Sequence, residues 1–404
     1  MERVSAAVDV GGFVIEPARA RLFRYAMTLV AAVVWIVVGV PLACGRLVAA
    51  LRRIGRGASQ LPEPQREPPM PRGCRRSFVT VRACRFQLTE AGLATARAGR
   101  LVLLLHGFPQ SAHCWRHVLE ALGGSSDALD SKGEGEGDGV RFVALDLRGY
   151  GGSVPEAGTA PWPHAAFSMP SLVADVREVI SALGFARAAV VGHDWGGMIA
   201  WAFAAAHPEM VSRLCVIAAP HPASFAPNIG WSQAWRSLYV ILFQMPWLPE
   251  LYISAAGGAA IDELFFGRAM GVRRASAAIT AGDAAVFKGA LLSRAGALTD
   301  ALLYYRNVFG INSTGPSSSS AAAEPRAAPL PMPVLQVWSD CDGALGLELT
   351  RGTAALCTDY RLVVLPNCSH WAAEDAPGEV VALLSEFLTL PVAAAPQPGA
   401  ASRR

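Results

Sequence analysis

The sequence is poor in charge and has no patterned cysteines, and these two features exclude several classes of function. Only 17% of its 404 residues are charged and the net charge is +3, so nothing in the composition suggests nucleic-acid binding. Its eight cysteines form no C-x-x-C pair and show no metal-ligand spacing. No internal repeat is visible. We therefore expect no nucleic-acid partner, and neither a metal nor an organic cofactor.

Hydrophobic residues are abundant instead, at 52% of the chain, and part of the excess lies in one run. Tyr25–Gly45 contains 21 residues without a charge and is flanked by Arg24 and Arg46. As a helix it would be roughly 30 Å long, the thickness of the bilayer core. A cleaved signal peptide has an apolar core of only about 7–15 residues, and a buried soluble helix is the other alternative. We predict a single transmembrane anchor.

The arginines on either side of this run give a weak indication of how the anchor is oriented in the membrane. Three arginines precede the run between residues 19 and 24, and four follow it between 46 and 56. Because positive residues favour the cytoplasmic side, the larger number after the run predicts a cytoplasmic catalytic part.

Short apolar runs alternate with helical patterns along most of the chain, which predicts an α/β protein with a mostly parallel sheet and helices on both faces. The segment from 222 to 331 differs, because it is largely helical and contains no clear strand. We expect it to be a helical lid inserted into the sheet domain. The predicted organisation is an N-terminal tail at 1–24, the anchor at 25–45, a Pro/Arg-rich linker at 46–75, the first part of the core at 76–221, the lid at 222–331 with a flexible loop at 313–330, the second part of the core at 332–392, and a disordered tail at 393–404.

The centre of the core is the stretch 188–202, where an apolar strand meets GHDWGG and a helix follows. This is the G-x-nucleophile-x-G pattern of a sharp strand-to-helix turn, with Asp194 at the position where most hydrolases have serine. Gly192 and Gly196 lack a Cβ, so strand and helix can approach closely. Asp194 is therefore a candidate nucleophile, and the alternative is an aspartate that caps the helix.

An acid and a histidine follow Asp194 in the order that this kind of turn requires. Asp340 and Asp342 come after the strand at 334–338, and His370 comes after the strand at 362–365. Catalytic groups of open parallel sheets gather at such carboxyl ends. The loop at 106–109 ends another strand, so we expect the backbone N–H groups of Phe108 and Trp195 to form an oxyanion hole near Asp194.

Several motifs together resemble the epoxide hydrolases of the α/β-hydrolase fold, and most closely the membrane-anchored branch that contains epoxide hydrolases 3 and 4. The resemblance covers roughly residues 76–392. It rests on HGFP at 106–109, DLRGYGGS at 146–153, GHDWGGMIAW at 192–201, FQMPWLPE at 243–250, YYRN at 304–307 and SHW at 369–371.

This resemblance implies a role for each candidate residue. Asp194 would attack an epoxide carbon and become an alkyl ester, while Tyr239 and Tyr305 donate hydrogen bonds to the ring oxygen. Asp342 matches the family's acid position better than Asp340, and it would orient His370. His370 would activate the water that hydrolyses the ester. The substrate-binding residues implied are His106, Pro109, Trp195 and Phe243.

The family also implies a vicinal diol as product, with water as second substrate and without a cofactor. Apolar residues of the lid suggest a lipophilic substrate such as a fatty-acid epoxide; they are Trp231, Trp235, Phe243, Trp247, Phe265 and Phe266. The expected location is the endoplasmic reticulum or microsomal membrane, with a role in lipid metabolism. Two alternatives remain open, a haloalkane dehalogenase with the same aspartate nucleophile and a non-catalytic membrane protein that keeps the fold.

The orientation of the anchor predicts the glycosylation state of the sequon Asn312-Ser313-Thr314. If the catalytic part faces the cytoplasm, endoglycosidase treatment of the protein from eukaryotic cells leaves its gel mobility unchanged. A shift to higher mobility would place the catalytic part in the lumen and contradict the charge argument.

Overall fold

The structure is a computed structural model that describes residues 8–10, 13–15, 70–92, 98–123, 139–157, 161–274, 277–308 and 328–389. The predicted anchor at 25–45 and the predicted tail at 393–404 lie outside the described residues. The same holds for most of the tail at 1–24, most of the linker at 46–75 and most of the loop at 313–330.

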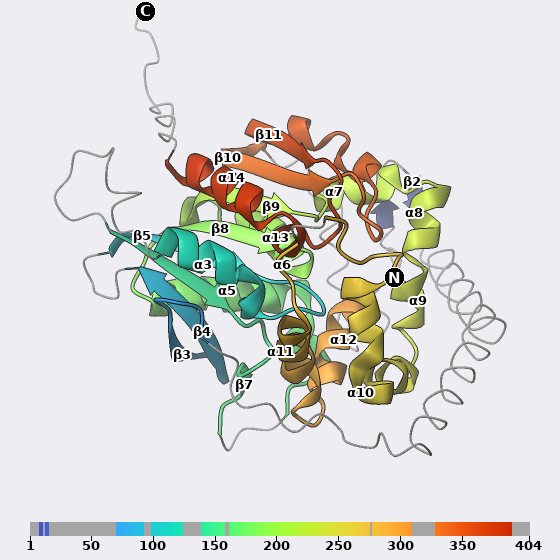
Figure 1. The fold of residues 1–404 in the computed structure, drawn as a ribbon. Coiled ribbons are helices and arrows are strands. Elements are labelled where there is room, and N and C mark those ends of the chain that lie inside the picture. Colours follow the sequence, from blue (N-terminus) through green and yellow to red (C-terminus); the bar gives the residue numbers. More distant parts are fainter. Residues whose placement is uncertain are drawn as a thin grey trace, which may run out of the picture.

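The described core is built around one large sheet (Figure 1). Its strands follow the order β11-β10-β9-β8-β5-β6-β4-β3, and β7 pairs with β4. The pairings from β11 to β6 are all parallel, whereas β3, β4 and β7 add antiparallel pairings at one end. The mostly parallel sheet predicted from the sequence is thereby confirmed. The strands are β3 (Arg75–Val81), β4 (Cys84–Gly92), β5 (Ala98–Leu105), β6 (Gly139–Leu145), β7 (Val154–Pro155), β8 (Ala188–His193), β9 (Val211–Ile217), β10 (Leu330–Ser339) and β11 (Cys357–Leu365); a separate pair consists of β1 (Val8–Val10) and β2 (Phe13–Ile15).

The central strands are apolar because helices cover both of their faces. Every residue of β8 is buried, as is every residue of the Leu101–Leu105 run in β5. Such continuous apolar runs are typical of strands in doubly covered parallel sheets. Around the sheet, α14 packs beside α3, and α5 packs beside α6 (Figure 1). The helices of the core are α3 (Arg116–Gly123), α5 (Met169–Ala182), α6 (Trp195–Ala206), α13 (Ala372–Asp375) and α14 (Pro377–Thr389), with 3₁₀ turns at 112–115, 164–167, 208–210, 347–350 and 353–356.

Between β9 and β10 the described residues form helices and no strand. Figure 1 shows α8 to α12 gathered at one end of the sheet. The helix α11 begins with a capping box, in which Thr280 and Asp283 bond to each other's backbone N–H. The helices of this segment are α7 (Pro222–Phe225), α8 (Trp231–Arg236), α9 (Leu238–Leu242), α10 (Leu248–Phe266), α11 (Ala281–Leu292) and α12 (Ala297–Val308), and a 3₁₀ turn covers 226–228. Among the described residues, no helix combines the length and the hydropathy needed to cross a membrane.

A buried ion pair fixes the loop after β6 to helix α5. Arg148 donates from Nη2 to Asp175 Oδ1 over 2.5 Å and from Nε to Asp175 Oδ2 over 2.7 Å. Both side chains are almost fully buried, and Arg82 adds a further hydrogen bond to Asp175. Tyr304 of α12 donates its hydroxyl proton to the carbonyl of Arg148, so the same loop also holds the inserted helices against the core. Removing one partner would leave a buried charge without compensation.

We therefore expect Asp175→Asn to lower the free energy of unfolding by about 3–5 kcal/mol, because Arg148 loses its counter-charge. Urea denaturation followed by tryptophan fluorescence measures this loss. The matched control is Glu386→Gln, which breaks an exposed pair with Arg361 and should change stability by less than about 1 kcal/mol. Equal effects of the two substitutions would contradict the importance of the buried pair.

Candidate active site

The turn between β8 and α6 holds Asp194 in a strained backbone conformation. Its φ is +52° and its ψ is −118°, which non-glycine residues rarely adopt. The two flanking glycines are required by space. A Cβ on Gly192 would lie 2.3 Å from the carbonyl oxygen of Gly196, and a Cβ on Gly196 would lie 2.3 Å from that of Leu105. The turn therefore projects the Asp194 side chain beyond the carboxyl end of the sheet.

The Asp194 carboxylate is held by groups from three segments. Its Oδ1 accepts a hydrogen bond from the backbone N–H of Phe108 over 2.9 Å, and the backbone N–H of Trp195 also bonds to the carboxylate. His370 Nε2 lies 3.5 Å from Asp194 Oδ2. Burial alone would raise the pKa of Asp194, but the hydrogen bond and the charge of His370 lower it. Apart from the contact with Trp195, the first residue of α6, the side chain makes no capping bond to the helix, so the structure gives no support to the helix-cap alternative.

His370 lies between two carboxylates. Its Nδ1–H donates to Asp342 Oδ2 over 2.8 Å, and Asp342 Oδ1 accepts the backbone N–H groups of Ala344 and Leu345. Asp340 is exposed instead and accepts the N–H of Cys368. Burial alone would lower the pKa of His370, but the charge of Asp342 and the hydrogen bonds to both carboxylates raise it to about 10. Of the two acids considered from the sequence, the structure brings Asp342 to His370.

An aromatic cluster from the inserted helices covers the turn. The ring centre of Tyr305 lies 4.9 Å from that of Trp195, 5.0 Å from that of Phe243 and 5.5 Å from that of Phe108. The ring centre of Tyr239 lies 5.9 Å from that of Tyr305, and the two side chains share a hydrogen bond. Burial raises the pKa of both phenols, so both keep their protons at neutral pH. The two predicted tyrosines and Phe243 thus meet beside Asp194.

Two other predicted binding residues are placed differently from this cluster. His106 is fully buried, and both of its ring nitrogens bond to backbone groups: Nδ1 donates to the carbonyl of Gly107, and Nε2 accepts the N–H of Leu147. Burial lowers its pKa to about 4, so the ring is neutral. His106 therefore has no free nitrogen for a substrate and acts as a brace between two loops. Pro109 is buried as well.

The six lid aromatics named from the sequence do not all face the site. Only Phe243 contacts the site. Phe265 is buried and packs against Trp371 and Phe287. The other four face solvent, with exposed fractions of 87% for Trp231, 72% for Trp235, 66% for Trp247 and 47% for Phe266. Helical spacing alone could not separate inward from outward aromatics on these short helices.

Two residues that sequence reasoning missed hold the catalytic loops. His193 is buried, and its Nε2–H donates to the backbone carbonyl of His370 over 3.0 Å. Asp375 is fully buried and accepts the backbone N–H groups of Ser369, Arg273 and Arg274. It thereby ties the His370 loop to the inserted segment. For His193 a signal existed, because a histidine in a strand buried on both faces must find a polar partner; for Asp375 there was none.

This arrangement combines an ionised carboxylate, a histidine oriented by an acid, two backbone donors and two protonated phenols. Such a set can perform nucleophilic displacement followed by hydrolysis of the covalent intermediate. Among the described residues, no group of three or more side chains is suited to bind a metal ion.

Comparison with known proteins also indicates a hydrolase. A family profile described as alpha/beta hydrolase fold matches residues 100–261. The chain is 33% identical to Epoxide hydrolase 4 of Mus musculus over 314 residues, covering 76% of this chain and 79% of that protein. It is also 33% identical to Epoxide hydrolase 3 of Xenopus tropicalis, with 71% of each chain covered.

The solved structure of the Bacillus megaterium epoxide hydrolase in complex with an inhibitor matches with a TM-score of 0.62 and 26% identity, covering 78% of this chain and all of the other. The fold and the site thus define an α/β hydrolase. This chain belongs to the epoxide hydrolase family of these enzymes, as its motifs predicted.

The two acids near His370 can be separated by experiment. We expect Asp342→Asn to lower turnover by about 10⁴-fold, because an amide in this position favours the wrong histidine tautomer. The pKa of His370, measured by NMR, should also fall below its value of about 10. Asp340→Asn is the matched control and should leave both quantities near wild type. The opposite pattern would assign the orienting acid to Asp340.

Proposed function

We propose that this protein adds water to an epoxide and produces a vicinal diol through an alkyl ester on Asp194. The observation that carries the proposal is the position of the Asp194 carboxylate between the Phe108 N–H, His370 and the phenols of the inserted helices. The names of the relatives in mouse and frog support the same activity.

In the first step, Asp194 Oδ2 attacks a ring carbon and the carbon–oxygen bond of the ring breaks. Oδ1 bonds to the N–H of Phe108, which leaves Oδ2 as the attacking atom. The ring oxygen becomes an alkoxide and takes a proton from the Tyr239–Tyr305 pair, whose phenols are kept protonated by burial. An aspartate is needed here because it forms an ester that can be hydrolysed, whereas serine would form a stable ether.

In the second step, His370 takes a proton from water, and the hydroxide attacks Cγ of Asp194. The negative charge that develops on Oδ1 is stabilised by the N–H groups of Phe108 and Trp195. Collapse of this intermediate breaks the bond between Cγ and the ester oxygen. The leaving oxygen takes the proton that His370 removed from water, and the diol departs. The new carboxyl group then gives its proton to His370, which restores the carboxylate.

The charge on Asp194 couples the two steps. In the free enzyme, both neighbouring carboxylates raise the pKa of His370. Formation of the ester removes the charge of Asp194, so the pKa of His370 falls. The protonated ring then gives its Nε2 proton to the phenolate left by the first step, and the neutral ring can accept a proton from water. His370 thus becomes a general base only when there is an ester to hydrolyse.

The contacts of Trp195 favour an epoxide over a haloalkane. A dehalogenase would use the indole N–H of this residue, together with a second donor from the lid, to bind halide. Here the indole stands nearly at a right angle to the ring of Tyr305, with ring centres 4.9 Å apart, so the lid group beside it is a phenol that can protonate an epoxide oxygen. The substrate class we propose is lipophilic, because the groups around the turn are the rings of Phe108, Phe243 and Tyr305.

The composition of residues 25–45 also supports a membrane location for the enzyme. We propose that this uncharged run anchors the catalytic part to an intracellular membrane such as the endoplasmic reticulum, so that a fatty-acid epoxide reaches the site from the lipid phase.

The ester route predicts a trapped intermediate in a histidine variant. We expect His370→Gln to form the ester and hydrolyse it slowly, so intact-protein mass spectrometry should show the mass of the enzyme plus one substrate. Asp194→Asn should show no adduct and no turnover. The control His164→Gln changes an exposed histidine and should behave as wild type. Full activity of Asp194→Asn would exclude the nucleophile assignment.

If the tyrosine pair protonates the ring oxygen, removing one phenol should slow the ring-opening step specifically. Tyr305→Phe should lower the rate of ester formation by about 10²-fold, because one acid donor is lost. Single-turnover kinetics measures this step. The control Tyr360→Phe removes a half-buried hydroxyl that bonds to Gln336, and its ester formation should match wild type. Halide release from a haloalkane without diol formation from epoxides would instead identify a dehalogenase.

A further inference from the structure

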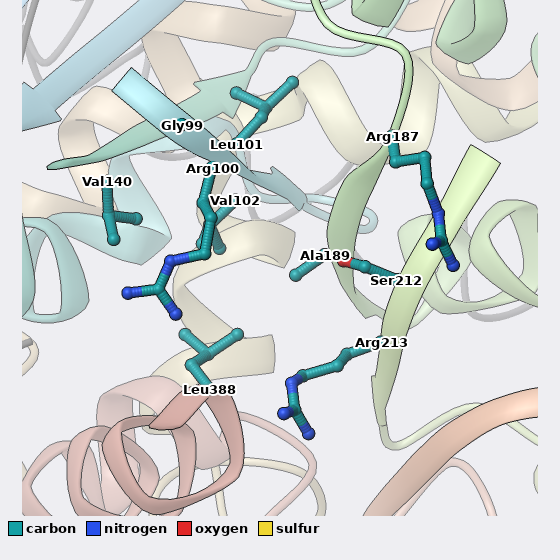
Figure 2. Close-up of a pocket in the computed structure, with 10 residues that line it drawn as sticks. All are labelled: Gly99, Arg100, Leu101, Val102, Val140, Arg187, Ala189, Ser212, Arg213 and Leu388. Carbon is teal, nitrogen blue, oxygen red and sulfur yellow. The ribbon is translucent and has the colours of Figure 1, made fainter. Parts of the chain in front are cut away.

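A cavity lies at the opposite end of the sheet from Asp194. It has a volume of about 160 Å³ and opens between the amino ends of β5, β8 and β9, beside Leu388 of α14 (Figure 2). Asp194 follows the carboxyl end of β8, so the two sites are separated by about one strand length, roughly 20 Å.

Three arginines line this cavity. Arg100 lies in β5, Arg187 directly precedes β8, and Arg213 lies in β9 (Figure 2). The strand pairings bring them together, because Leu101 pairs with Ala188 and Ala189 pairs with Arg213. The lining contains no acidic residue, and its fourth polar side chain is Ser212.

The largely buried side chain of Arg213 forms no ion pair with the described part of the chain. Only 6% of the residue is exposed, and its guanidinium makes no ion pair or hydrogen bond with the part of the chain that the structure describes. Its Cζ lies 5.7 Å from the centre of the Phe387 ring. Burial and the charge of Arg100 lower the pKa of Arg213, and exposed Asp359 raises it only in part. The guanidinium nitrogens of Arg213 are not fully buried and reach the cavity, so an anion bound there can pair with them.

The neighbouring arginines are exposed and free to turn toward a ligand. Arg187 donates one hydrogen bond, from Nη2 to the carbonyl of Val211 over 3.2 Å, which leaves most of its donors available. Arg100 is exposed at the rim of the cavity. A guanidinium offers several N–H donors in a planar fork that matches two oxygens of a phosphate or a carboxylate.

We propose that this cavity binds a phosphate group that carries two negative charges. Three positive charges favour a dianion over a single carboxylate, and Ser212 provides a hydroxyl for a third oxygen. The site is independent of epoxide hydrolysis, because none of its residues belongs to the Asp194 site at the other end of the strands.

The proposal is tested by isothermal titration calorimetry, in which inorganic phosphate is titrated into the full-length protein at constant ionic strength. We expect saturable binding of one phosphate, weakened about tenfold or more by Arg213→Gln and by Arg100→Gln. Arg100 is exposed, so its variant stays informative even if Arg213→Gln does not fold. The matched control Arg177→Gln replaces an exposed arginine on α5 that lies outside the cavity, and its binding should equal wild type. Epoxide turnover should be unchanged in the Arg100 variant.

Two results would overturn the proposal: no saturable binding by the wild type, or equal weakening by Arg177→Gln and Arg100→Gln. The source of the phosphate is found by repeating the titration with dihexanoyl phosphatidate, a soluble lipid with the same phosphate monoester. Tighter binding of the lipid indicates a lipid headgroup, and equal binding indicates a soluble phosphate; both results support the site.

The chain itself carries a competing source of negative charge, because five acidic residues lie between 124 and 138, directly before β6. Replacing them with their amides tests this possibility. If phosphate binds only to that variant, the arginines pair with the chain itself and the proposal is wrong.

Discussion

The hydrogen bond from the Phe108 N–H to the Asp194 carboxylate is the contact on which the rest of the site depends. It fixes Oδ1 beside a backbone N–H donor. In the mechanism we propose, Oδ1 is the atom on which negative charge develops during ester hydrolysis, and Oδ2 is the atom that attacks the substrate. The strained turn makes this contact possible, since only glycine at 192 and 196 allows strand and helix to come so close. His370 and the aromatic rings of the inserted helices are arranged around this one carboxylate.

Much of the fold was visible in the sequence because a few local patterns constrain it strongly. The apolar runs Leu101–Leu105 and 188–191 define strands buried on both faces, and GHDWGG defines the turn after the second. The order of Asp194, Asp342 and His370 follows from the order of strand ends. In a parallel sheet, groups that follow neighbouring strands meet at one edge. The tyrosines were identified only through the family resemblance, because nothing local distinguishes Tyr239 or Tyr305 from packing residues.

The parts of the site that were not predicted depend on contacts between segments far apart in the chain, and no local sequence pattern marks such contacts. His106 follows a strand and was expected at the substrate, but both of its nitrogens bond to backbone from neighbouring loops. Asp375 lies in an unremarkable Ala-Ala-Glu-Asp turn, yet it joins the His370 loop to the inserted helices. The arginine cavity arises only when strand register aligns three separate strand starts.

The most direct measurement is a single turnover in water labelled with heavy oxygen, followed by mass spectrometry of the diol and of the peptide that contains Asp194. The account predicts an unlabelled diol and one heavy oxygen in Asp194, because water attacks the carboxyl carbon of the ester and the new hydroxyl of the diol comes from the aspartate. A heavy oxygen in the diol after the first turnover, with Asp194 unlabelled, would show direct attack of water on the epoxide and contradict the ester route.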